Sequence, residues 1–108
     1  METIISQENT LVTLVNVFTV VPEQQQELVD LLIEATDQVM RHLSGFISAN
    51  IHKSLDGTKV VNNAQWESQE AFAAMLHNEE AIPHMAKAAR IAQSVEPHLY
   101  EVAYVDHE

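Results

Sequence analysis

The stretch "FISANIHKSLDGTKVVNNAQW", residues 46–66, decides the fold, because it holds two strand-like runs joined by a turn signal. In Phe46–Leu55 apolar and polar residues alternate, which predicts a strand. Asp56-Gly57 follows, and this dipeptide is a strong signal for a tight hairpin. The run Thr58–Trp66 is therefore expected to pair antiparallel with the first run.

A strand and a helix are predicted on the N-terminal side of this hairpin. Residues 11–20, "LVTLVNVFTV", are nearly all β-branched or apolar, with one interruption at Asn16, and predict a buried strand. Pro22 is favourable at the first position of a helix. Residues 23–43 predict an amphipathic helix ended by Gly45, because apolar residues recur three to four apart: Leu28, Leu31, Leu32, Ala35, Val39 and Leu43.

The C-terminal side predicts helical segments and a last strand. Ser68 can cap a short helix over residues 68–78, and a second helix begins near Pro83 and ends at Pro97. Residues 98–106, "HLYEVAYVD", predict the final strand. The order β-α-β-β-α-(α)-β is that of the ferredoxin-like split βαβ motif, an α+β fold with helices on one face of a four-stranded antiparallel sheet.

This architecture leaves the second face of the sheet bare. The predicted strands are apolar on both sides, so we expect that face to pack on a second copy and form a homodimer. Residues 11–106 are expected to form a single domain after a flexible N-terminal tail, residues 1–10.

Composition narrows the function. The chain has 108 residues, only five Lys and Arg, and a formal net charge of −11, which argues against nucleic acid or an anionic membrane as partner. It has no cysteine, which excludes disulfides and zinc–thiolate sites. No signal peptide and no apolar run near the roughly 20 residues of a membrane span are seen, so a cytoplasmic protein is expected.

The amides of "VVNNAQW", residues 60–66, are unusual in a strand, since a buried amide without a partner costs free energy. Strand alternation places Asn62 on the face of Trp66, about 13 Å from it along the strand. Asn63 and Gln65 take the opposite face, toward a partner subunit or water. Asn62 is therefore predicted to point into a cavity between sheet and helices.

The face on which His52 lies depends on the hairpin loop. If Asp56-Gly57 is a two-residue turn, His52 lies opposite Val61 and faces away from Asn62. If the loop has three residues with a bulge at Gly57, His52 lies opposite Val60, on the same face as Asn62. Both registers are compatible with the sequence, and the two-residue turn sorts the apolar residues more cleanly.

Residues 52–72, "HKSLDGTKVVNNAQWESQEAF", resemble the antibiotic biosynthesis monooxygenase domain family, above all its cofactor-free, actinorhodin-type polyketide oxygenases. This resemblance implies a dimeric α+β barrel with an active-site cavity between sheet and helices. It also implies that Asn62 and Trp66 hold a phenolic substrate and stabilise its anion, and it gives a match for His52. Two positions depart from the pattern: Phe72 replaces a tyrosine of the proposed proton relay, and Ala86 replaces an arginine.

The implied activity is a cofactor-independent monooxygenation of a small aromatic or quinol-type compound by dioxygen. An amide and an indole N–H can stabilise an oxyanion, and a neutral histidine can act as a base near pH 7. The candidate catalytic residues are Asn62, Trp66 and His52. The candidate substrate-binding residues are Phe72, Asn16, His84 and Met75.

Two other functions remain open. Sibling proteins of this fold bind and degrade haem, and their strand asparagine matches Asn16, whereas Met75 and Met85 stand where they carry a tryptophan and the axial histidine, one residue past His84. The second alternative is a non-catalytic dimer that binds a small ligand, which the missing tyrosine and arginine favour. The spacing of the six histidines does not support a metal site.

Overall fold

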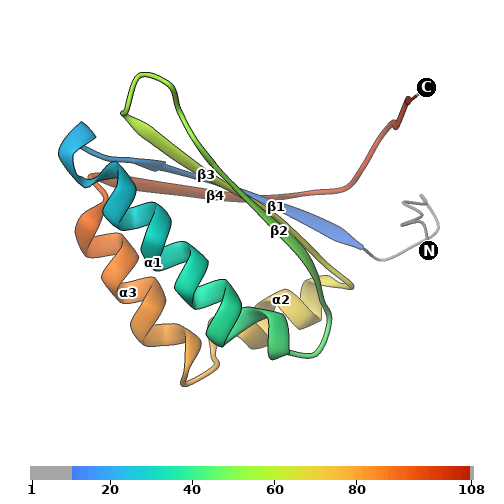
Figure 1. The fold of residues 1–108 in the computed structure, drawn as a ribbon. Coiled ribbons are helices and arrows are strands. Elements are labelled where there is room, and N and C mark those ends of the chain that lie inside the picture. Colours follow the sequence, from blue (N-terminus) through green and yellow to red (C-terminus); the bar gives the residue numbers. More distant parts are fainter. Residues whose placement is uncertain (1–10, 108) are drawn as a thin grey trace.

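The computed structural model describes residues 11–107, which form a four-stranded antiparallel sheet with α-helices on one face (Figure 1). The predicted tail, residues 1–10, lies outside the described residues. The strand order is β2-β3-β1-β4, so the α+β, ferredoxin-like split βαβ fold is confirmed. The elements are β1 (Val12–Thr19), η1 (Pro22–Gln24), α1 (Gln25–Gln38), η2 (Met40–His42), β2 (Phe46–Lys53), β3 (Lys59–Trp66), α2 (Gln69–Leu76), α3 (Ala81–Ile91) and β4 (Ser94–Tyr100).

The β2–β3 hairpin has a longer loop than the two-residue turn but keeps the register of that turn. Ser54 N donates to Lys59 O at 3.0 Å, and Gly57, at φ +83°, donates to Ser54 O at 3.2 Å. Asp56 accepts from the backbone N–H of Thr58 at 3.0 Å. In this register His52 pairs with Val61, so it faces away from Asn62.

The C-terminal part differs from the sequence-based prediction. Helix α3 ends at Ile91, and Pro97 lies inside β4 instead of ending the helix. Strand β4 is at the edge of the sheet, where a proline can be accommodated. The final strand was expected over residues 98–106, but β4 covers Ser94–Tyr100, and residues 101–106 extend away from the sheet, where no strand of the described chain pairs with them (Figure 1).

The start of α2 follows from a side-chain cap, because Ser68 Oγ accepts from Ala71 N at 3.0 Å, which confirms the predicted cap. Helix α3 begins at Ala81, two residues before Pro83, and its N-cap residue, Glu80, makes no side-chain cap hydrogen bond. In the turn before it, Asn78 Oδ1 accepts from Ala81 N at 3.1 Å. Both helices contribute side chains to the core.

The core consists of two groups of buried side chains. The first, which we name the aliphatic cluster, lies between β1, β3, α1 and α3 and contains Phe18, Val20, Leu28, Val29, Leu31, Val60 and Ala88. The second, the tryptophan cluster, contains Val12, Val39, Trp66, Met75 and Ala81, with Met40, Leu43, Phe46, Ala71, Phe72 and Met85 packed against it.

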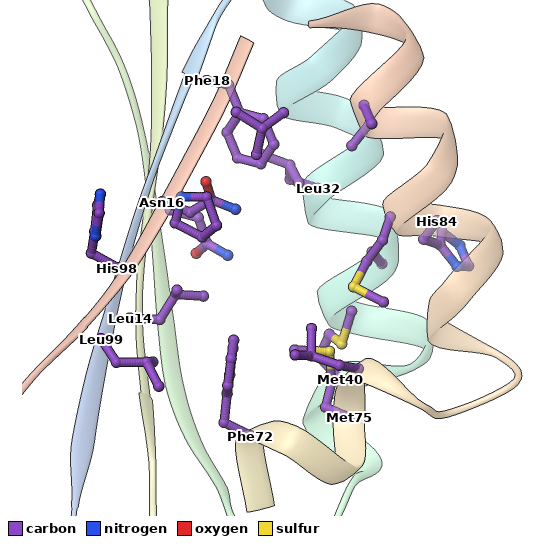
Figure 2. Close-up of a pocket in the computed structure, with 18 residues that line it drawn as sticks. Leu14, Asn16, Phe18, Leu32, Met40, Phe72, Met75, His84, His98 and Leu99 are labelled. Atoms are coloured by element: carbon purple, nitrogen blue, oxygen red, sulfur yellow. The ribbon is translucent and has the colours of Figure 1, made fainter. Parts of the chain in front are cut away.

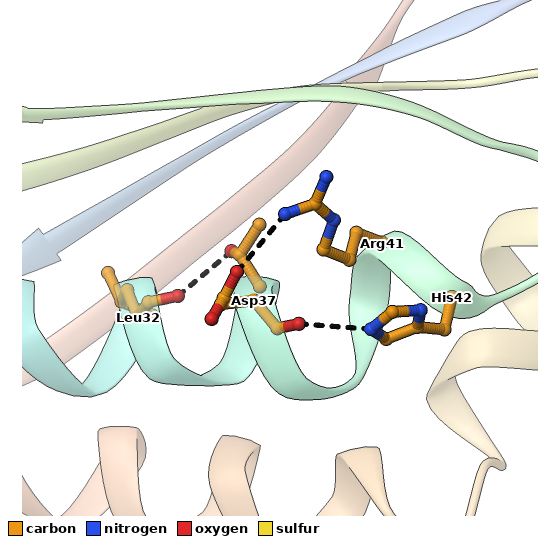
Figure 3. A network of polar contacts seen from close by, with 5 residues as sticks. Leu32, Asp37, Arg41 and His42 are labelled. Carbon is orange, nitrogen blue, oxygen red and sulfur yellow. Dashed lines mark hydrogen bonds and ion pairs between the residues drawn. The ribbon is translucent and has the colours of Figure 1, made fainter.

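The polar end of α1 is stabilised by local contacts (Figure 3). Thr36 Oγ1 donates to Leu32 O at 2.9 Å, Arg41 Nη1 lies 3.1 Å from Asp37 Oδ1, and His42 Nε2 donates to Asp37 O at 3.2 Å. The Arg41–Asp37 pair is exposed and so contributes only about 0.3–0.5 kcal/mol. Thr36, Asp37, Arg41 and His42 are not among the residues that line the cavity described below.

The second face of the sheet carries Thr13, Val15, Val17, Val61 and Asn63, and no helix of residues 11–107 covers it (Figure 1). Several of these side chains are apolar and only partly buried. We name this surface the open face. Between residues 11 and 107, no helix has the length and apolar character to cross a membrane.

Candidate active site

A cavity of about 360 Å³ lies between the helix-covered face of the sheet and the helices (Figure 2). This volume is within the range of small-molecule sites, roughly 300–1,000 Å³. The lining is largely apolar and comes from every strand except β2 and from all three α-helices. It includes Leu14, Asn16, Phe18, Leu32, Met40, Asn62, Phe72, Met75, Leu76, His84, Met85 and Leu99.

Two asparagines form the polar part of the lining. The β1–β3 register places Asn16 directly opposite Asn62, and both line the cavity. The Oδ1 atom of each is buried and has no hydrogen-bond partner. A buried acceptor without a partner costs about 1–3 kcal/mol, and a hydroxyl group on a ligand would remove this cost.

The asparagine pair results from strand alternation. Leu14 and Phe18 stand two residues on either side of Asn16 and point the same way, as do Val60 and Ala64 around Asn62. All four neighbours are buried and apolar. The two amides are therefore held side by side among apolar side chains, where electrostatic interactions are stronger than in water.

Trp66 lies behind the cavity wall. It is 2% exposed and is not among the lining residues. Its ring makes edge-to-face contacts with Phe46, at 5.5 Å between centroids, and with Phe72, at 6.3 Å. Phe72 does line the cavity, so Trp66 supports the wall through Phe72, and its catalytic role stays a prediction.

His52 does not join the other candidates. It is exposed on the open face of the sheet, opposite Val61, and does not line the cavity. Its catalytic role also stays a prediction, and one that the position of this side chain within a single chain does not support.

Two histidines border the cavity without turning into it. His84 Nδ1 lies 3.1 Å from Glu80 O, and Nε2 lies 3.4 Å from Glu34 Oε2 on α1. Figure 2 shows the His84 ring on the side of α3 away from the sheet, and His98 on the opposite side of the sheet from the helices. Among the described lining residues, no ionisable side chain points at the asparagine pair.

The structure also locates the two residues that depart from the family pattern, Phe72 and Ala86. Phe72 lines the cavity, so the lost hydroxyl would have faced it, whereas Ala86 is exposed and off the lining. The sequence reasoning missed Leu14, Phe18, Leu32, Met40 and Met85. Alternation around Asn16 could have found Leu14 and Phe18, whereas the helix residues depend on how the helices pack.

No group of three or more His, Asp or Glu side chains within residues 11–107 is placed to hold a metal ion. The carboxyl group of Asp56 sits in the β2–β3 loop. The Thr58 backbone N–H, with the Ser54 and Thr58 hydroxyls, lowers the pKa of Asp56 to about 2. This carboxylate organises the loop and is not part of the cavity lining.

The fold and this cavity agree with the result of a family comparison. The sequence model described as "Antibiotic biosynthesis monooxygenase" matches residues 11–90. The chain belongs to this family. Among its relatives, tetracenomycin-F1 monooxygenase from Streptomyces glaucescens is 50% identical over 80 residues, which are 74% of this chain and 71% of that protein.

Solved structures share the fold. A variant of SnoaB, described as a cofactor-independent oxygenase from Streptomyces nogalater, superposes with a TM-score of 0.80 at 22% identity, over 92% of this chain and 99% of that chain. An anthrone oxidase-like protein superposes with a TM-score of 0.82 at 27% identity. That similarity covers 93% of this chain and 42% of the other.

Proposed function

We propose that this protein is a cofactor-independent monooxygenase that oxidises a small aromatic or quinol-type compound with dioxygen. The observation that carries the proposal is the Asn16–Asn62 pair, whose buried Oδ1 atoms lack partners in an apolar cavity. Further support comes from the relatives, one named a monooxygenase and one described as a cofactor-independent oxygenase.

The asparagine pair suits a phenol in both of its protonation states. A phenolic O–H can donate to Oδ1 of either amide, and the Nδ2–H groups can donate to the oxyanion after the proton leaves. One preorganised donor of this kind is typically worth about 10²–10³ in kcat. The pair would thus favour the electron-rich anion, which is the form that reacts with dioxygen.

The proposed reaction needs no outside reductant. A phenol with hydrogen at the reacting ring carbon loses that hydrogen and the hydroxyl hydrogen, and gains one oxygen atom to become a quinone. The second oxygen atom leaves as water together with the two hydrogens. The substrate supplies four electrons, and dioxygen accepts four.

The proton of the phenol must leave without a protein base inside the cavity, since no described lining residue offers an ionisable group turned inward. Leu76 and Leu99 line the cavity and are also exposed, so they mark its opening to water. We therefore propose that solvent takes the proton. The pH dependence of kcat/KM should then follow the pKa of the substrate phenol, shifting with more acidic substrates.

The residues present do not fit haem. The nearest histidine to the expected axial position, His84, has Nδ1 3.1 Å from Glu80 O and Nε2 3.4 Å from Glu34 Oε2, so both ring nitrogens face acceptors outside the cavity. Met85 and Met75 stand at the other two positions and line the cavity. No step through haem is proposed.

The experiment that tests the function is oxygen uptake with anthrone-type and quinol substrates in the presence of a metal chelator. Asn62→Ala should lower kcat by about 10²–10³. Asn63→Ala is the matched control, since the neighbouring amide lies on the open face, and it should change kcat by less than about threefold. Isotopically labelled dioxygen should place one labelled atom in the product and one in water.

Two results would count against an enzyme. No oxygen uptake by the unmodified protein across the substrate panel would favour the non-catalytic, ligand-binding alternative. Equal uptake by Asn62→Ala and Asn63→Ala would show that the asparagine pair does not act on the substrate.

We also propose that two copies associate through the open face. Val15, Val17 and Val61 give it an apolar centre, with His52, Asn63 and other polar groups around them, which is the composition of an interface. Val17→Lys should turn a dimer into a monomer in light scattering, whereas Leu55→Lys, in the exposed hairpin loop, should not. A monomeric unmodified protein would overturn this proposal.

A further inference from the structure

The methionines are distributed unevenly. The chain has four, and Met1 lies outside the described residues. The other three, Met40, Met75 and Met85, all line the same cavity, although they come from three separate elements, η2, α2 and α3. Their positions in the sequence share no repeat or motif, so the fold alone brings them together.

The ordinary explanation for a core methionine is that it fills an irregular gap. All three side chains do pack on the tryptophan cluster, and the aliphatic cluster contains none. They nevertheless border an unfilled volume of about 360 Å³. A methionine next to empty space can change rotamer without displacing a neighbour, because its unbranched chain has three rotatable bonds.

We propose that Met40, Met75 and Met85 form an adjustable wall that sets the range of fused-ring aromatic compounds the site accepts. The proposal rests on the proposed function, because it concerns the same cavity and the same class of substrate. The wall adapts by rotamer change to ring systems of different length, and the sulfur atoms can contact ring edges at about 5 Å.

The two sides of the cavity would then recognise different parts of one ligand. Asn16 and Asn62 lie on the sheet side and bind a hydroxyl group. Figure 2 shows Met40 and Met75 on the helix side, across the cavity from Leu14. The amide pair would recognise a hydroxyl group on the ligand, and the methionine wall would select for the size of its ring system.

The test compares ligand binding with and without the adjustable side chains. The triple variant Met40→Leu, Met75→Leu, Met85→Leu keeps volume but removes much of the freedom, since Leu-for-Met exchange is among the best-tolerated core changes. Hydroquinone, dihydroxynaphthalene and the anthrone dithranol serve as one-, two- and three-ring probes. Binding is measured without oxygen by the fluorescence of Trp66, the only tryptophan, which contacts the cavity-lining Phe72.

The unmodified protein should bind the two larger probes with dissociation constants within about tenfold of each other. The triple variant should keep the affinity of its better probe within about threefold and lose at least about tenfold for the other. Leu31→Met is the control: it is buried in the aliphatic cluster, away from the lining, and should leave the ratio unchanged.

A second protein guards against misfolding of the triple variant. A chain made with norleucine in place of every methionine keeps flexible side chains without sulfur. It should bind the same range of probes as the unmodified protein. Three results would each overturn the proposal. The first is an unchanged ratio of probe affinities in the triple variant, and the second is a norleucine protein that no longer binds both larger probes with similar affinity. The third is that no probe binds to the unmodified protein. Binding of the probes without oxygen uptake would instead count against the proposed oxygenase activity alone.

Discussion

The aliphatic cluster and the tryptophan cluster lie on the same face of one sheet, and the cavity opens where they meet. Phe18 and Ala88 of the first and Met75 of the second all contribute to its lining. The aliphatic cluster is built mostly from branched side chains with few rotamers, whereas the tryptophan cluster combines aromatic rings with methionines. The comparison shows how one small core can be tightly packed in one cluster and leave a cavity beside the other.

The largest expected loss of stability tests whether the aliphatic cluster is the less adaptable of the two clusters. Leu28 is fully buried there, so Leu28→Ala should lower the free energy of unfolding by about 2–5 kcal/mol in a urea titration. Leu55→Ala, in the exposed hairpin loop, should change it by less than about 0.5 kcal/mol. A loss below about 1 kcal/mol for Leu28→Ala would break the comparison, because it would mean that this half repacks easily.

The next largest loss of stability tests how tightly the residues at the edge of the tryptophan cluster are packed. Gly45 has φ +88°, and a Cβ at this position would overlap the Cβ of Ala71. Gly45→Ala should cost about 2 kcal/mol or more in the free energy of unfolding. Gly57→Ala, at φ +83° but 3.2 Å from its nearest neighbour, Pro22 Cβ, should cost less, because only a small shift is needed to relieve this contact. Equal losses in the two variants would show that strain alone, without the packing on Ala71, sets the cost.

A smaller effect of opposite sign concerns the boundary between the clusters. Asn62→Leu removes a buried oxygen that has no partner, so the free energy of unfolding should rise by about 1 kcal/mol while binding of phenolic ligands falls. Asn63→Leu, on the open face, should leave the binding of phenolic ligands unchanged. Lower stability of Asn62→Leu would mean that the amide is satisfied by ordered water and is not held ready for a ligand.

The smallest effect lies at the loop beyond the aliphatic cluster. The pKa of Asp56 is lowered from 3.8 to about 2, so its ionised form is favoured by folding. Its stabilising contribution is fully present above about pH 4 and is lost as the pH falls through about 2. The protection of the Thr58 amide hydrogen, measured relative to its intrinsic exchange rate at each pH, should fall over this range. Asp56→Asn should abolish this pH dependence without disturbing either cluster. A midpoint near pH 4 in an NMR titration would contradict the assignment.

Much of the fold could be predicted from local pattern. The hairpin at Asp56-Gly57, the alternation in β3 and the cap at Ser68 are short-range features, and the structure contains all three, although the hairpin loop is longer than two residues. Pro97 was misleading, because whether a proline ends a helix or sits in an edge strand depends on the position of that strand in the sheet.

The site was predictable only in part, for a related reason. Alternation places Asn62 and Trp66 on one face, and the register confirms this. It cannot tell which of them meets empty space, because Phe72 from α2 covers the indole and leaves the amide uncovered. The direction of the His84 ring likewise depends on Glu34, a residue 50 positions away on a neighbouring helix.

The asparagine pair spans β1 and β3, the two central strands, each of which is held by a neighbour on both sides. The opposite wall comes from side chains on α1, η2, α2 and α3, none of which belongs to the sheet. Substitutions in that wall can therefore accumulate without altering the sheet or its amides. A chain built in this way can acquire new substrates during evolution while the group that recognises the hydroxyl stays where it is.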